Sequence, residues 1–266
     1  MKKLLLLVLS LGILSSCTSV GPSTQQSSRV KAKPAVNRDQ TGELWSMAPS
    51  NGRLLFYGVS GRRSKPEEAI QLALEDAARK VAMFYSVEGS MVQQSTSGSA
   101  TFDYSSTTDT TLLYDTDYKK YLAMLEYDPE TDVFEYQQML VVRAWHRTSS
   151  SVPSYQSSWQ DGRPTWTLET PTIPGFQVGV GYAGRRSVHK DTVNASHENA
   201  LFAIISKRSN AVQNNSTSYR GPGTFDYGSR TNSTITSSGR LEGFYVLATW
   251  EDPRDKSLWS LSIARQ

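Results

Sequence analysis

The chain of 266 residues carries 28 lysines and arginines against 25 aspartates and glutamates, 38% hydrophobic residues and one cysteine. This near-neutral balance gives no indication of nucleic-acid binding, which calls for clustered basic residues. One cysteine excludes a disulfide within the chain. The modest apolar content favours thin helix-on-sheet layers over a single large core.

The N-terminus has the pattern of a secretory signal. Lys2 and Lys3 precede an apolar run over 4–14, which is too short to span a bilayer as a stable helix. Small residues then lead to Cys17, and this order is similar to a bacterial lipoprotein signal, in which the cysteine is lipidated and becomes the new N-terminus. We predict a signal peptide over 1–16 and lipidation of Cys17. Cleavage would leave 26 basic and 25 acidic residues.

The lipoprotein resemblance also implies a location. Thr18 stands where an aspartate usually retains lipoproteins in the inner membrane. We therefore expect a chain anchored by its lipid in the outer membrane and facing the periplasm, with a surface-exposed placement as the alternative. Residues 17–42 are rich in polar residues and predict a flexible tether.

Two four-residue identities recur at one offset. Gly-Arg-Arg-Ser at 61–64 returns at 184–187, and Thr-Phe-Asp-Tyr at 101–104 returns at 224–227, each 123 residues later. Upstream, Trp45 and Gly58 match Trp166 and Gly179 at an offset of 121, which suggests a two-residue insertion in the glycine turn. We predict a first repeat at 43–148, a linker at 149–163 and a second repeat at 164–266.

Each repeat has the same order of predicted elements. A strand at 54–59 (176–180 in the second repeat) enters a glycine turn and an amphipathic helix, and a β-prone stretch follows at 86–94. Two strands joined by a hairpin turn close each unit, at 120–127 and 134–145 and at 244–250 and 258–264. The predicted fold class is α+β. It consists of two tandem β-α-β-β-β units, each with one helix packed on an antiparallel sheet, as separate domains or joined through paired edges.

The helices are specified by their start and by one face. Ser64 with Glu67 predicts a capping box, and Pro66 suits a first turn. The apolar stripe comprises Ile70, Leu74, Ala77, Val81 and Phe84, whereas Glu68, Glu75 and Lys80 fall off it. In the second helix His197 stands where Leu74 stood, which predicts an interface position or a satisfied buried hydrogen bond. No cysteine or carboxylate spacing joins the histidines into a metal site, and we predict no cofactor.

The first repeat resembles a known family. Trp45 lies upstream of a strand that ends in a glycine turn, and Glu67-Glu68-Ala69, Ala73, Asp76-Ala77-Ala78-Arg79 and Val81-Ala82 follow on the helix. This pattern, from Trp45 to about Trp145, is similar to the Lpp-twenty family of outer-membrane lipoproteins, some of which assemble flagellar basal structures. The second repeat departs from it, with Thr192-Val193-Asn194-Ala195 in place of Glu-Glu-Ala. The resemblance implies a lipid anchor and a non-enzymatic role in the envelope or its appendages.

Two motifs are candidate sites. Arg62, Arg63 and Ser64, and again Arg185, Arg186 and Ser187, precede a helix start. There they either meet acidic loop residues such as Asp128 or Asp252, or form an anion site with the free N–H groups of the helix. The aromatic residues Phe102, Tyr104, Phe225 and Tyr227 either close the rim of the sheet or contact a partner.

These observations favour an interaction protein over an enzyme, because no nucleophile or acid–base constellation is present in the sequence. The leading hypothesis is a structural or assembly lipoprotein that binds a protein partner or itself. The alternative is a lipoprotein that captures an anionic envelope molecule through the repeated arginines.

Overall fold

The computed structural model describes residues 43–46, 52–98, 104–208, 211–220 and 227–266. These ranges all belong to one compact unit. Cys17, Phe102 and Phe225 lie outside the described residues, as do the predicted signal peptide and tether.

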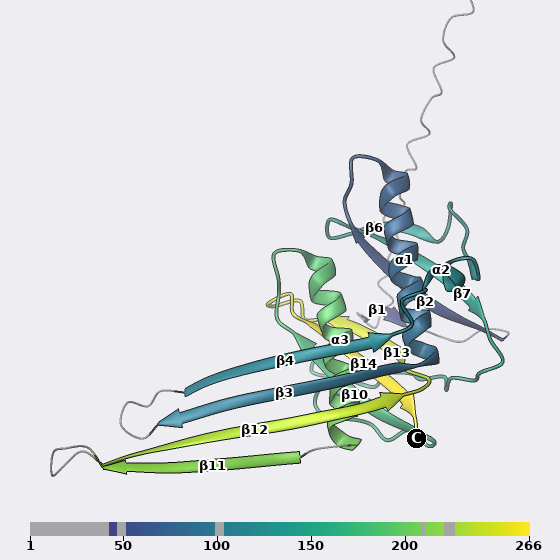
Figure 1. The fold of residues 1–266 in the computed structure, drawn as a ribbon. Helices are drawn as coiled ribbons and strands as arrows, with labels where there is room; N and C mark the ends of the chain where they lie inside the picture. Colours follow the sequence, from purple (N-terminus) through teal and green to yellow (C-terminus); the bar gives the residue numbers. More distant parts are fainter. Residues whose placement is uncertain (1–42, 47–51, 99–103, 209–210, 221–226) are drawn as a thin grey trace, which may run out of the picture. The chain divides into compact units, whose positions relative to one another are not determined.

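The described chain is a mixed α/β fold with mostly antiparallel sheets and few helices (Figure 1). Its first half contains β1 (Glu43–Ser46), β2 (Arg53–Gly61), α1 (Pro66–Tyr85), β3 (Val87–Gly98), β4 (Tyr104–Tyr114), α2 (Lys119–Leu122), β5 (Leu125–Glu126), β6 (Val133–Tyr136) and β7 (Met139–Arg147). The second half contains β8 (Trp159–Gln160), β9 (Arg163–Pro164), the 3₁₀ turn η1 (Thr165–Thr167), β10 (Phe176–Ala183), α3 (His189–Arg208), β11 (Ala211–Arg220), β12 (Tyr227–Leu241), β13 (Tyr245–Glu251) and β14 (Leu258–Arg265).

Strands from the two halves pair directly. One sheet has the order β1-β13-β14-β10, so the first strand of the described chain joins strands of the second half. A second sheet has the order β2-β7-β5, with β6 also on β7, and β8 pairs with β9. The third sheet, β11-β12-β3-β4, joins one hairpin from each half through β12 and β3. The sequence left open whether the two repeats are separate domains or are joined through paired strand edges. The structure has the joined arrangement, because β12 pairs with β3.

Each long helix packs closely on a strand at a glycine. A Cβ added to Gly58 would lie 1.8 Å from the carbonyl oxygen of Ala73, and one added to Gly181 would lie 2.1 Å from that of Ser196. Only glycine permits this approach, because any side chain would overlap the helix backbone. Gly58 and Gly181 are 123 residues apart in the sequence, and so are Ala73 and Ser196. The contacts therefore match Gly58 with Gly181, whereas the sequence comparison matched it with Gly179.

The third sheet, β11-β12-β3-β4, is rich in serine and threonine and is called the polar sheet below; it consists of two long hairpins, β3-β4 and β11-β12 (Figure 1). The two hairpins have related registers. In β3 and β4, Ser90 lies opposite Thr111; in β11 and β12, Gln213 lies opposite Thr234, again 123 residues later. Between the hairpins, β12 pairs with β3 from Arg230 opposite Gly98 to Leu241 opposite Val87. Val87 and Leu241 are fully buried, so this end of the sheet is part of the core.

Three local predictions are wrong. The N-cap of α1 is Lys65, without a side-chain capping bond, so Ser64 and Glu67 form no capping box. The strand predicted at 120–127 begins as helix α2, and the one predicted at 134–145 is divided by a turn at Gln137 and Gln138, whose φ angles are 41° and 65°. Backbone in this left-handed region cannot continue a strand.

The region predicted as a linker packs partly against the core. Val152 is 7% exposed, and Tyr155 and Trp159 pack against buried residues. Trp166 is also buried, and its indole nitrogen donates to Ser157 Oγ at 3.0 Å. Trp45 lies in strand β1 but Trp166 in a 3₁₀ turn, so the two predicted counterparts occupy different structures.

Candidate functional site

An open hollow of about 700 Å³ brings together arginines from both Gly-Arg-Arg-Ser motifs. Its lining residues come from the end of β2, the turn between β6 and β7, and the start of α3; they are Gly61, Arg62, Gln137, Gln138, Met139, Arg185, Arg186, Ser187, Val188, His189 and Lys190. Arg63 and Ser64 are not among them. The structure thus places four of the six predicted anion-site residues around one hollow.

The acidic partners expected for the arginines are engaged elsewhere. Asp252 binds Arg254, whose guanidinium lies 2.6 Å away and lowers the pKa of the carboxyl to about 2. Asp128 accepts a hydrogen bond from the backbone of Glu130. Arg62 instead pairs with Glu135 at 2.8 Å, with 61% and 47% of the two side chains exposed. Arg62 thus meets an acidic residue, as the sequence suggested, but this residue is Glu135 and not Asp128 or Asp252.

The two helix starts differ at this hollow. Helix α3 begins at His189, and Val188, His189 and Lys190 line the hollow. Helix α1 begins at Pro66, which has no N–H to donate, and carries two acidic residues, Glu67 and Glu68, in its first turn, whereas α3 carries one, Asp191. Negative charge at that end repels an anion. The anion-site hypothesis therefore applies to the start of α3 and not to that of α1.

A buried carboxylate lies beside the hollow. Glu251, which is 7% exposed, accepts hydrogen bonds from Tyr136 at 3.1 Å and from Gln137 at 2.7 Å. The Lys256 ammonium lies 3.0 Å from it, and His189 Nε2 lies 3.4 Å away. The cluster connects the β6–β7 turn of the first half with β13 and α3 of the second. Burial of a charge requires such partners.

His189 is neutral in this cluster at neutral pH. Its pKa is lowered chiefly because burial disfavours the charged imidazolium; Glu251 opposes this effect, and Lys256 and Arg185 add to it. The same imidazole faces the arginine hollow, so an anion bound there would favour its protonation.

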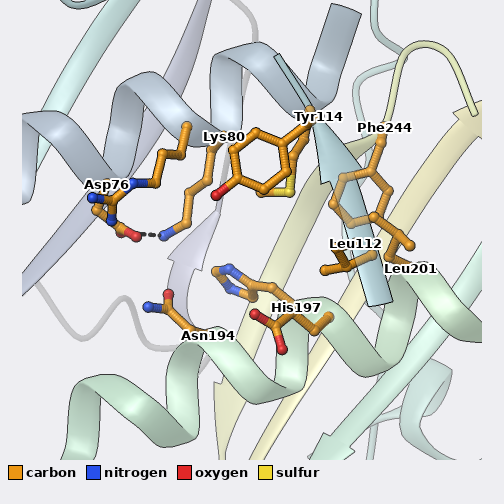
Figure 2. A pocket seen from close by; sticks show the side chains of 11 residues that line it. Asp76, Lys80, Leu112, Tyr114, Asn194, His197, Leu201 and Phe244 are labelled. Atoms are coloured by element: carbon orange, nitrogen blue, oxygen red, sulfur yellow. Dashed lines mark hydrogen bonds and ion pairs between the residues drawn. The ribbon is translucent and has the colours of Figure 1, made fainter. Parts of the chain in front are cut away.

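A second, smaller pocket of about 140 Å³ lies between α1 and α3 (Figure 2). Asp76 and Lys80 project from α1, Asn194 and His197 from α3, and Leu112, Leu201 and Phe244 form apolar wall. Lys80 Nζ lies 2.8 Å from Asp76 Oδ2 and donates to the carbonyl oxygen of Tyr57 at 2.8 Å. Asp76 also accepts from the backbone N–H of Val59 at 2.9 Å.

This pair was missed in the sequence. Lys80 falls off the apolar stripe, which predicted exposure, yet it is only 9% exposed. The sequence does place Lys80 four residues after Asp76, and residues four apart are neighbours on a helix, so the spacing indicated an ion pair. Spacing alone does not distinguish a buried pair from an exposed one.

His197 belongs to a chain of polar side chains under α3. Its Nε2 lies 3.2 Å from Thr249 Oγ1, which lies 3.4 Å from Ser260 Oγ, and Ser196 Oγ lies 2.7 Å from the same serine. Burial holds the pKa of His197 well below its usual value, and the Lys80 ammonium adds to this shift. The prediction of a buried, hydrogen-bonded histidine is confirmed for Nε2, whereas its buried Nδ1 finds no partner within the described residues.

The predicted aromatic contacts are only partly described. Tyr104 is the first residue of β4, opposite Ser97, and Tyr227 is the first residue of β12, opposite Arg220. Both tyrosines therefore lie where a hairpin strand begins. Their phenylalanine neighbours lie outside the described ranges, so the partner-contact hypothesis stays a prediction.

Comparison with known proteins finds no family model, no curated protein and no solved structure that matches this chain. Over the described ranges, no helix combines the length and apolar character of a membrane span. Nor do histidine, cysteine, aspartate and glutamate side chains in those ranges form a group of three or more that could hold a metal ion.

Proposed function

We propose that the protein is a lipid-anchored envelope lipoprotein with a non-enzymatic, structural or assembly role. The observation that carries this proposal is the polar sheet, in which hairpins from both halves combine and the outer strands β4 and β11 have no strand partner in the described part of the chain. Unpaired strand edges are templates for pairing with another chain. Self-association is the form of assembly that this sheet supports best.

The proposal includes a tandem organisation with the repeats at 43–148 and 164–266, in which the single β-prone stretch of the predicted β-α-β-β-β unit is a two-stranded hairpin, β3-β4 or β11-β12. It is supported by two structural contacts that recur at the sequence offset of 123, namely the glycine approaches of Gly58 and Gly181 and the hairpin registers at Ser90 and Gln213. Unrelated halves have no reason to share one offset in both a helix contact and a strand register. The resemblance to the Lpp-twenty family remains part of this proposal.

The size of the mature protein tests the assembly role. We expect light scattering in detergent to give a discrete oligomer whose mass exceeds that of the micelle-bound monomer. A monomer at every concentration would argue against assembly and favour the ligand-binding alternative.

The anchor has its own test. Cys17→Ala should leave the chain unprocessed or release it from the membrane fraction, because the thiol that receives the lipid is absent. The anchor proposal is wrong if this variant is cleaved at the signal and still partitions into the detergent phase.

The second candidate function is capture of an anionic envelope group, and the arginine hollow favours it. Arg62, Arg185 and Arg186 line one hollow at the start of α3, where guanidinium forks and free backbone N–H groups suit phosphate or carboxylate oxygens. Lipid headgroups, lipopolysaccharide phosphates and peptidoglycan carboxylates have this chemistry.

A charge-matched pair of variants tests the second candidate. Arg185→Gln/Arg186→Gln should weaken binding to lipopolysaccharide vesicles, and the difference should shrink as salt rises. The control, Arg63→Gln/Lys65→Gln, removes the same charge from residues outside the hollow. Equal binding by both variants would leave the arginines without a ligand-binding role.

A further inference from the structure

The two outer strands of the polar sheet have matched lengths and few protecting features. β4 has 11 residues and β11 has 10. Natural edges are usually guarded by lysine, proline or inward charges. Residues 104–114 contain one charged residue, Asp109, and no proline, and residues 211–220 contain one, Arg220 at the end. Residues 108–111 of β4 are exposed.

The strand directions permit head-to-tail joining. Every neighbouring pair in the order β11-β12-β3-β4 is antiparallel, so β11 and β4 run in opposite directions. When two copies stand side by side in the same orientation, β4 of one therefore meets β11 of the other as an antiparallel pair. An odd number of strands would not allow this.

The chain already contains a joint of the same kind. β12, the second strand of its hairpin, pairs with β3, the first strand of the other hairpin. A contact between β4 and β11 of a second copy would again join a second strand to a first strand. Because the two hairpins have registers related by 123 residues, the internal joint also specifies a register. In the internal joint, Thr234 lies opposite Gln94. The counterpart of Thr234 is Thr111, 123 residues earlier, and the counterpart of Gln94 is Thr217, 123 residues later. The equivalent joint between two copies therefore places Thr111 opposite Thr217.

We propose that β4 of one molecule pairs antiparallel with β11 of a second copy, with Thr111 opposite Thr217. This inference rests on the proposed assembly function and names its interface. The register places residues 108–114 opposite residues 220–214. Because the contact is heterologous, each added copy leaves one β4 and one β11 edge free, and growth ends only if the subunits close into a ring.

Cysteine cross-linking tests the register. In full-length protein carrying Cys17→Ser, the pair Thr111→Cys/Thr217→Cys should form disulfides on mild oxidation and give a ladder of dimers and larger species on a non-reducing gel. Within one chain the two positions are separated by three strand spacings, about 14 Å, and by eight residues along the strands, which exceeds disulfide reach. Any such disulfide therefore joins two molecules.

The matched control moves one cysteine along the same strand face. Thr111→Cys/Gln213→Cys lies four residues out of register, about 13 Å along the strand, and should cross-link at least tenfold less. Mixing the single variants Thr111→Cys and Thr217→Cys should give dimers only, because each molecule then carries one reactive edge.

The outcomes separate the two proposals. A parent protein that is monomeric by light scattering and gives no preferential cross-link overturns both the assembly role and this interface. A parent oligomer in which the 111/217 pair cross-links no better than 111/213 retains assembly but overturns the edge pairing. An oligomer without preferential 111/217 cross-linking is also the result expected if a different extended polypeptide pairs with β4 and β11.

Discussion

The contacts of α1 on β2 and of α3 on β10 share a backbone approach but bury different polar chemistry beside it. In both, a strand glycine meets a helix carbonyl, Gly58 with Ala73 and Gly181 with Ser196. Near the first contact lies the ion pair of Asp76 and Lys80. Near the second lies a chain of hydroxyl groups that ends at His197. The backbone approach is therefore the feature that the two halves share, while each half satisfies its buried polar groups separately.

Adding a Cβ to either glycine at the helix–strand contact should destabilise the protein more than any other change considered. Gly58→Ala and Gly181→Ala should each lower the free energy of unfolding by more than about 3 kcal/mol, because the added Cβ overlaps helix backbone that cannot move alone. Gly61→Ala is the control, since no atom lies within 4 Å of its added Cβ. Midpoints of urea unfolding measure the difference. Equal midpoints for all three variants would mean that the close approach does not require glycine, and a loss in only one of Gly58→Ala and Gly181→Ala would refute the equivalence of the two contacts.

Loss of the buried ion pair should destabilise the protein more than a change at the matching position of the second half. Lys80→Met should destabilise the protein by about 3 kcal/mol, because it leaves the Asp76 carboxylate buried without its countercharge. Asn199, 123 residues after Asp76, is exposed and donates to the carbonyl oxygen of Tyr182. Asn199→Ala should therefore cost less than about 1 kcal/mol. Similar losses in urea unfolding would mean that the ion pair is not specific to the first half.

A pH effect is expected for the second half. The folded pKa of His197 lies below its unfolded value of about 6.5. The unfolded chain therefore binds the proton first, and stability falls as the pH falls below about 6.5. For one group the slope reaches at most about 1.4 kcal/mol per pH unit.

His197→Leu should reduce that slope between pH 6 and pH 5 and leave the slope between pH 8 and pH 7 unchanged. The leucine reproduces the residue at the matching position, Leu74, but leaves Thr249 Oγ1 without its histidine partner and so lowers stability at pH 7. His146 and His189, whose pKa values are also lowered by burial, add to the slope that remains, and Glu198, whose pKa is raised by burial, opposes it. Unfolding free energies across this pH range would show an unaltered slope if His197 were accessible to protons when folded.

The smallest effect concerns the exposed arginine near the turn. Arg62→Ala removes the ion pair with Glu135, in which both side chains are largely exposed, and should cost no more than about 0.5 kcal/mol. The loss should disappear in 0.5 M salt. A loss of several kcal/mol that persists in salt would mean that Arg62 supports the junction between the halves.

Several helices and turns could be predicted from neighbouring residues alone. Pro66 and the spacing of Ala77, Val81 and Phe84 predicted α1, and Asp252-Pro253 predicted the hairpin between β13 and β14, because helix periodicity and turn chemistry are properties of neighbouring residues. The recurrence of Gly-Arg-Arg-Ser likewise revealed the offset of 123 residues.

The pairing of distant segments could not be predicted in this way, because it depends on tertiary packing. The joint of β12 with β3 and the addition of β1 to β13 depend on segments more than a hundred residues apart. The Ser/Thr-rich strands carry no alternation of apolar residues from which their extent or register could be inferred. Burial of Lys80 and the match of Gly58 with Gly181 were also decided by packing, because each depends on how closely a helix approaches its strand and not on the residues beside it in the chain.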